Sequence, residues 1–144
     1  MSDTLKKPKV FLDTSVILAG LNSPLGGSGA VLALGKLGRI VLAVSPEVIE
    51  EVERNIKNKF PLLSMGFVDF MLSTSILTKT ASPKELKSAY RLLPTEDAPI
   101  FAAARKAQPD FLLTLDKEFE RLMKNFALFK ICSPGEFLQQ FRDS

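Results

Sequence analysis

Residues 9–21 read KVFLDTSVILAGL, and this stretch does most to decide the fold. Val10–Leu12 is a short, continuous apolar run, which is typical of a strand buried on both faces. Asp13 closes the run, and residues 14–21 continue with helical spacing. The pattern therefore predicts a buried strand that ends at a carboxylate and leads directly into a helix.

The rest of the chain repeats this alternation of apolar runs and helical patterns. Further strands are expected at residues 40–44, 75–80, 111–115 and 128–131. Further helices are expected at residues 30–37, 46–58, 63–72, 83–91, 96–107 (capped by Thr95), 117–123 and from Pro134 onward, with a Gly-rich loop at 22–29. Strands apolar on both faces that alternate with helices predict an α/β fold, with a mostly parallel sheet between two helical layers and a relation to the Rossmann architecture.

Length and composition fit one globular domain. The chain has 144 residues, of which 46% are hydrophobic and 24% charged, so a disordered chain is excluded. We expect a single domain over residues 1–144, with residues 1–8 as a flexible N-terminus. The N-terminus lacks the apolar run of a signal peptide, and no apolar segment reaches about 18 residues. A cytoplasmic protein without a membrane partner is expected.

The residue types that are missing narrow the chemistry. There is no His, which excludes Ser–His–Asp triads, imidazole acid–base catalysis and His-bearing zinc sites. The single Cys, Cys132, excludes an intrachain disulfide and suits a reducing compartment. The net charge of +3 permits an anionic partner such as nucleic acid but is equally ordinary for a solvated surface. Chemistry is left to carboxylates, hydroxyls, Lys, Arg and a hard metal ion.

Four acidic residues occupy the places where such a fold binds ligands. Asp13 and Asp116 follow predicted strands, and Glu51 lies in the helix after the second strand. Asp97 lies in the first turn of the helix that leads to the strand before Asp116. In open α/β sheets ligands bind beyond the carboxyl ends of the strands. We therefore expect all four carboxylates to face one crevice.

Gathering four carboxylates is costly without a cation. At a separation of about 5 Å and an effective dielectric constant of about 20, each pair of like charges repels by about 3 kcal/mol. A polyvalent cation offsets that repulsion, and a site with only oxygen ligands favours Mg²⁺ or Mn²⁺. The chemistry of such a site is phosphodiester hydrolysis.

Each acid also has a simpler structural explanation. Asp13 and Asp116 are placed to cap the helices that follow them, and Asp97 could complement a helix dipole. Glu51 belongs to an acidic helix face, and periodicity alone does not separate it from Glu53. The case for a site therefore depends on the joint placement of the four acids.

Three segments resemble the PIN-domain nucleases and, more narrowly, the VapC-like toxins of prokaryotic toxin–antitoxin pairs. The resemblance covers about residues 9–137, and within it the acid six positions after Ser45 is Glu51 rather than Glu53. The three segments are KVFLDTSVILAGL, AVSPEVIEEVERNI and LPTEDAPIFAAARKAQPDFLLTLDKEF.

The resemblance implies a divalent-metal-dependent endoribonuclease, with RNA as substrate, an antitoxin protein as partner, and a homodimer or higher homo-oligomer. It implies that one or two Mg²⁺ or Mn²⁺ ions are held by Asp13, Glu51, Asp97 and Asp116. It also implies hydroxyl hydrogen bonds behind these ligands from Thr14, Ser15 and Thr114, and a contact from Lys117 to a substrate phosphate.

Two other functions stay open from the sequence. Ser15 stands where the family often has Asn, so a catalytically weak or inactive member that binds RNA or a protein partner is one alternative. The second is an Asp-based phosphotransfer protein with Asp13 as nucleophile. A haloacid-dehalogenase-type phosphatase would carry a second Asp two positions on, where this chain has Ser15.

Overall fold

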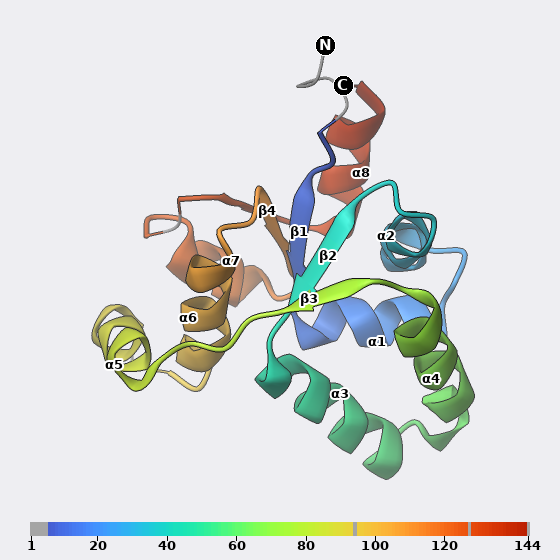
Figure 1. Ribbon diagram of the computed structural model, residues 1–144, viewed down its shortest axis with the longest axis horizontal. Helices are drawn as coiled ribbons and strands as arrows, with labels where there is room; N and C mark the ends of the chain where they lie inside the picture. The colour runs from blue at the N-terminus through green and yellow to red at the C-terminus, as the bar shows by residue number, and fades with distance from the viewer. Residues whose placement is uncertain (1–5, 94, 127, 144) are drawn as a thin grey trace.

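A five-stranded parallel sheet organises the chain. The computed structural model describes residues 6–93, 95–126 and 128–143. The strand order is β3-β2-β1-β4-β5, and all four pairings are parallel (Figure 1). The strands are β1 Lys9–Leu12, β2 Val41–Val44, β3 Ile76–Thr78, β4 Phe111–Leu113 and β5 Lys130–Cys132.

Helices cover both faces of the sheet, so the predicted three-layer α/β/α fold is confirmed. In Figure 1, α5, α6 and α7 lie on one side of the strands, while α2 and α4 lie on the other. The α-helices are α1 Thr14–Asn22, α2 Gly27–Lys36, α3 Pro46–Asn58, α4 Ser64–Ser73, α5 Pro83–Leu92, α6 Ala98–Ala107, α7 Lys117–Met123 and α8 Pro134–Asp143, and a 3-10 turn η2 covers Pro61–Leu63.

The core lies along the three central strands. Phe11 in β1, Leu42 in β2 and Leu112 in β4 are completely buried, as the continuous apolar runs predict for strands covered on both faces. Central strands of this kind form a rigid frame for the residues that follow them. The loops at their carboxyl ends therefore hold side chains in fixed positions.

Several predicted boundaries are wrong. Helix α2 begins at Gly27, inside the predicted loop 22–29, and its Gly29 packs closely against the backbone of Pro24. Strand β5 covers Lys130–Cys132 rather than 128–131, because its register is set by pairing with β4. The predicted strands at 40–44, 75–80 and 111–115 are shorter in the structure, with β4 ending at Leu113.

The start of α6 also differs from its prediction. Thr95 is not the N-cap residue of α6, because residues 96 and 97 form a turn before the helix; within this turn Thr95 Oγ1 accepts a hydrogen bond from the backbone N–H of Asp97 at 3.1 Å. The helix therefore begins later, at Ala98, and Asp97 becomes its N-cap residue.

The structure bears on two further expectations, a flexible N-terminal segment and the lack of a membrane-spanning helix. Of the expected flexible segment 1–8, residues 1–5 lie outside the described residues, and residues 6–8 have no regular secondary structure. Within the described ranges, no single helix is long and apolar enough to cross a membrane. Helices α1 and α2 satisfy the length and composition criteria only as a pair bent by 96°.

Glycine packing in α2 gives a test of this fold. A Cβ atom at Gly29 would lie 2.2 Å from the carbonyl oxygen of Pro24, and backbone cannot move aside as a flexible side chain can. We predict that Gly29→Ala lowers the free energy of unfolding by about 2 kcal/mol through overpacking.

Gly66→Ala in α4 is the matched control. A Cβ at Gly66 would meet only Leu21 Cδ2, at 3.9 Å, so helix propensity predicts a gain of about 0.5 kcal/mol. Urea denaturation measures both variants. Equal stability of the two variants would contradict the close approach of α2 to Pro24.

Candidate active site

Adjacent strands β1 and β4 place two acidic residues at one edge of the sheet. The chain reaches β2 and β3 on one side of β1, and β4 and β5 on the other, so this edge is a topological switch point. Asp13 follows β1 directly, and its backbone N–H donates to the Leu113 carbonyl of β4 at 3.3 Å. Asp116 lies three residues beyond the end of β4. Crevices for ligands form at such switch points.

Asp13 is a buried carboxylate held by hydroxyl groups. Asp13 is 8% exposed. Oδ1 accepts from Ser15 Oγ at 2.5 Å and from the Val16 N–H at 3.3 Å, and Oδ2 accepts from Thr114 Oγ1 at 2.5 Å. Burial raises the pKa of Asp13 and outweighs these hydrogen bonds, which act to lower it.

The same hydroxyls tie the two strand ends together. Ser15 Oγ accepts from the Leu115 N–H at 3.1 Å, and Thr114 Oγ1 accepts from the Asp116 N–H at 3.0 Å. Each hydroxyl therefore donates to Asp13 and accepts from the loop after β4, which fixes Asp13 relative to Asp116. Thr14 makes no such bond, because its Oγ1 is buried without a hydrogen-bond partner among the described residues.

Asp13 and Asp116 also cap helices, as their positions alone would predict. Asp13 accepts from the first turn of α1. Asp116 Oδ1 accepts from the N–H groups of Glu118 and Phe119 at 3.0 and 3.2 Å. Within the described part of the chain, Oδ2 of Asp116 has no hydrogen bond. Capping therefore orients Asp116 and leaves one of its oxygens available to a ligand.

Asp97 lies at the start of α6. It occupies the N-cap position of α6, yet its side chain makes no capping hydrogen bond. Its pKa is raised, first by burial and then by the negative charges of Asp116, Glu96, Asp13 and Glu51. The carboxylates predicted from the sequence therefore lie close enough to repel one another electrostatically.

Glu51 reaches this edge from α3. Ser45 begins that helix, because its buried Oγ accepts from the Val48 N–H at 3.2 Å. Glu51 is half-buried, whereas the other acids of α3, which are Glu47, Glu50 and Glu53, are exposed. The charge of Glu51 is one of those that raise the pKa of Asp97, which links α3 to the acids beyond β1 and β4.

The arrangement suits a hard cation but is not a closed cage. Over the described ranges, no group of three or more acidic or cysteine side chains is positioned to hold a metal ion. Mg²⁺ commonly retains several waters and binds through only one or two carboxylates, so a closed set of protein ligands is not required. All candidate ligands are carboxylate oxygens, the donors that Mg²⁺ and Mn²⁺ prefer.

Two charged residues, Lys117 and Glu96, lie next to the candidate acids in the sequence. Lys117, expected to contact a phosphate, is exposed at the start of α7 beside Asp116. Glu96 is an additional acid of the site that the sequence pattern does not identify, and its charge contributes to the raised pKa of Asp97. Its position next to Asp97 was the only signal that the sequence offered.

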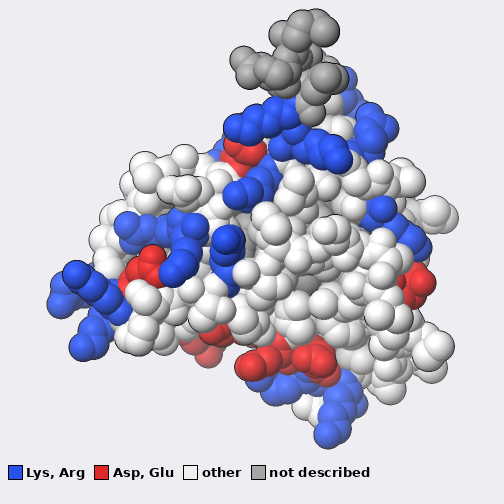
Figure 2. Space-filling model, viewed as in Figure 1, with Lys and Arg blue, Asp and Glu red and all other residues white. Residues whose placement is uncertain are grey.

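Charge is unevenly distributed over the surface. Figure 2 shows acidic side chains gathered at the lower edge of the molecule, over α3. Lys and Arg dominate to the left, over α5 and α6, and at the top of the same view. At the lower edge Lys and Arg side chains lie directly beside these acids, so the surface over α3 carries charges of both signs.

Solved structures of similar fold include three proteins below 25% identity. One is a chain of VapBC2 from Rickettsia felis, bound to a DNA fragment from its promoter: 20% identity, TM-score 0.61, coverage of 85% of this chain and 96% of that one. Another is VapC20 from Mycobacterium tuberculosis, a toxin that cleaves the sarcin-ricin loop: 20% identity, TM-score 0.57, coverage of 78% and 93%. The third is PAE2754 from Pyrobaculum aerophilum: 17% identity, TM-score 0.67, coverage of 95% and 91%.

At these identities the three structures establish a shared fold. No curated protein matches the chain. The family model of the PIN domain matches residues 9–118, from β1 through the beginning of α7, and this range includes all four candidate acids. The match spans well over half of the sequence, and this protein therefore belongs to the PIN domain family.

Proposed function

We propose that this protein is a divalent-metal-dependent endoribonuclease and the toxin of a toxin–antitoxin pair. The observation that carries the proposal is Asp97, an uncapped carboxylate whose pKa is raised by burial and by four neighbouring acids. A folded protein has little reason to keep such an arrangement unless a cation relieves the repulsion. Membership of the PIN family supports the same chemistry.

Asp13, Glu51, Asp97 and Asp116 would hold one or two Mg²⁺ or Mn²⁺ ions. The chemistry that such an ion supplies when bound is activation of water and stabilisation of the charge that develops on the scissile phosphate. Ser15 and Thr114 keep the Asp13 carboxylate in one orientation, because each donates to a different oxygen. Lys117, exposed beside Asp116, would bind a phosphate oxygen of the substrate.

RNA is the proposed substrate, and an antitoxin the proposed partner. The fold is shared with VapC20, which cleaves the sarcin-ricin loop, and with a chain of the VapBC2 complex. These likenesses support the proposal without fixing which RNA is cut. Phosphotransfer through Asp13 is less favoured, because position 15 carries Ser15, which donates to Asp13, in place of a second acid.

An apolar groove between α3 and α4 is the proposed surface for a second copy of the chain. It has a volume of about 700 Å³, and its lining includes Ile49, Ile56, Phe67 and Met71. Leu72 lines the groove at 83% exposure, and Met65 of α4 is 80% exposed. Exposed apolar side chains beside an apolar groove are typical of an association surface.

Metal binding is tested by melting temperature and cleavage together. Wild-type protein in millimolar Mn²⁺ should melt at least about 5 °C higher than in EDTA, because an ion that binds only the folded state stabilises it. Asp13→Asn and Glu51→Gln should lose most of this shift. Both variants should also cut structured RNA at least about 100-fold more slowly.

Glu50→Gln is the matched control, since Glu50 is the exposed neighbour of Glu51 on the same helix. It should keep the wild-type shift and the wild-type cleavage rate. A wild-type protein that neither gains stability with Mn²⁺ nor cuts RNA would instead support an inactive member that only binds partners.

The raised pKa of Asp97 predicts a gain in stability when its charge is removed. In the folded protein ionisation is disfavoured, so the carboxylate costs stability at pH values above its raised pKa. The cost disappears below the ordinary value of 3.8. In EDTA at pH 7, Asp97→Asn should therefore raise stability by about 0.5 kcal/mol, a figure that allows for solvent screening.

This gain should shrink as the pH falls toward 4, and Mn²⁺ should stabilise the wild type but not Asp97→Asn. Thermal denaturation between pH 4 and 8, with and without Mn²⁺, measures both effects. A variant less stable than the wild type in EDTA at pH 7 would show that repulsion among these acids is not significant.

Self-association is tested with one substitution at two exposed leucines. Leu72→Lys places a charge in the α3–α4 groove and should shift a dimer toward monomer by at least about tenfold in dissociation constant. Leu37→Lys, at a residue 73% exposed at the end of α2, is the control and should leave association unchanged. Sedimentation velocity measures both. A monomeric wild type, or equal effects of the two changes, would exclude this surface.

A further inference from the structure

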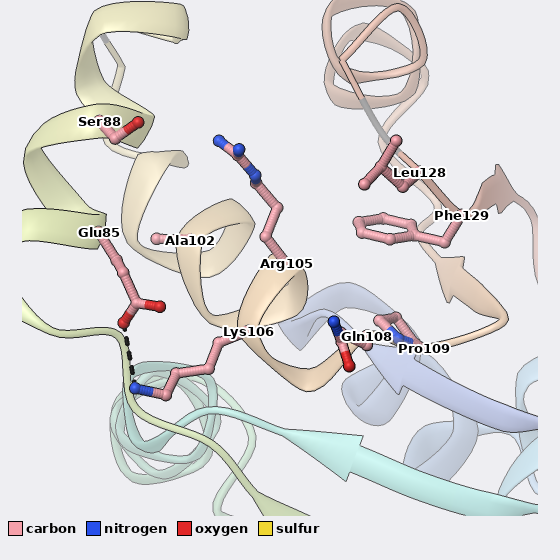
Figure 3. A pocket seen from close by; sticks show the side chains of 9 residues that line it. All are labelled: Glu85, Ser88, Ala102, Arg105, Lys106, Gln108, Pro109, Leu128 and Phe129. Carbon is pink, nitrogen blue, oxygen red and sulfur yellow. Dashed lines mark hydrogen bonds and ion pairs between the residues drawn. The ribbon is translucent and has the colours of Figure 1, made fainter.

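A second cavity lies at the opposite edge of the sheet from the acidic residues. It has a volume of about 430 Å³ and is lined by residues from α5, from α6, and from the segments that precede β4 and β5 (Figure 3). Its volume falls within the range of about 300–1,000 Å³ that is typical of small-molecule sites. The proposed nuclease reaction uses none of its lining residues.

Arg105 supplies a cationic group to this cavity without an acidic partner. Among the described residues, the ion pairs involve Lys36, Lys106 and Arg121 but not Arg105. In Figure 3, Arg105 extends into the space between α5 and the Leu128–Phe129 segment, whereas Lys106 turns away to its ion pair with Glu85 at 3.1 Å. The Arg105 guanidinium is thus available to an anion.

One wall of the cavity is apolar and partly aromatic. Phe129 is half-buried, with its ring centroid 6.5 Å from that of Phe101, and the Arg105 guanidinium lies 5.5 Å from the Phe101 centroid. Leu128, at the rim, is completely exposed. An aromatic ring beside an unpaired guanidinium is the combination on which unstacked bases are held.

Gln108, which also lines the cavity, has an unusual backbone conformation. It ends α6 with φ 51° and ψ 56°, and it is the single non-glycine residue with positive φ in the described part of the chain. This position after a helix favours Gly, and a side chain there costs free energy. The side chain that is retained lines the cavity, and its amide can both donate to and accept from a base edge.

We propose that this cavity binds a nucleotide, with its base against Phe129 and Leu128, its phosphate on Arg105 and a base edge on the Gln108 amide. Free nucleotides and nucleotides within an RNA strand share this chemistry. The cavity lies away from the acidic edge, so binding here is independent of divalent metal and of cleavage.

Calorimetry on the full chain in EDTA tests the proposal, with AMP, adenosine, inorganic phosphate and a short single-stranded RNA as separate probes. AMP should bind with a submillimolar dissociation constant and more tightly than adenosine or phosphate. Arg105→Gln should weaken AMP binding about tenfold, and Phe129→Leu about fivefold. Lys87→Gln, an equal change of charge on α5 outside the cavity lining, should have no effect.

Gln108→Gly separates binding from a structural role. Gly relieves the left-handed conformation, so the urea midpoint should rise while AMP affinity falls severalfold. A merely structural Gln108 would change stability alone, and that result would remove the residue from the site.

The probes distinguish the source of the ligand. RNA binding that depends on Arg105, without AMP binding, would support the site and identify the strand as the ligand. Phosphate binding as tight as AMP binding, with no effect of Phe129→Leu, would overturn the proposal in favour of a simple anion patch. Affinities for AMP and RNA that Arg105→Gln leaves unchanged would overturn it as well. None of these outcomes depends on whether the protein cuts RNA.

Discussion

Repulsion among carboxylates at the carboxyl edge of the sheet is the constraint on which the account of this protein depends. Asp13 is buried and Asp97 has no capping bond; burial is the first cause of the raised pKa of both, and at Asp97 the negative charges of neighbouring acids raise the pKa further. Helix capping explains why acids follow β1 and β4, but it does not explain why a further unsupported acid is held among them. The proposed hard cation would explain both the choice of residue types and their convergence, because it would stabilise all the charges at once.

The fold supplies the rigidity that this arrangement requires. Asp13 follows a strand with no exposed apolar side chain, and two hydroxyls fix its oxygens while they accept hydrogen bonds from the loop after β4. The charged edge is thus assembled from segments about 100 residues apart in sequence. Carboxylates that are already held in place lose little conformational freedom when they bind an ion. A rigid scaffold therefore raises the affinity of the site for the ion. The cavity lined by Arg105 and Gln108 lies at the opposite edge of the sheet.

The sequence predicted the parts of this structure that depend on local pattern. Val10–Leu12 and the run before Thr114 are apolar on both faces, so their burial and parallel pairing could be anticipated, and with them the edge shared by Asp13 and Asp116. The start of α6 at Ala98 could not be anticipated, because a Thr side chain that accepts from the N–H two residues on is the usual pattern of an N-cap, and here that hydrogen bond lies in a turn before the helix. The start of α2 at Gly27 could not be predicted, because glycine has a low helix propensity and a Gly-rich stretch is typical of a loop. The close packing of Gly29 against Pro24 is visible only in the structure. Periodicity also left Glu51 and Glu53 equal, and only the packing of α3 shows which is half-buried.

The most direct measurement is a crystal structure of the wild-type protein grown with Mn²⁺, with anomalous scattering recorded to locate the ion. We expect an anomalous peak at the carboxyl ends of β1 and β4, within about 2.5 Å of oxygens from Asp13 and at least one of the other three acids. An ordered site with no peak there, or manganese bound only elsewhere on the surface, would contradict the central claim.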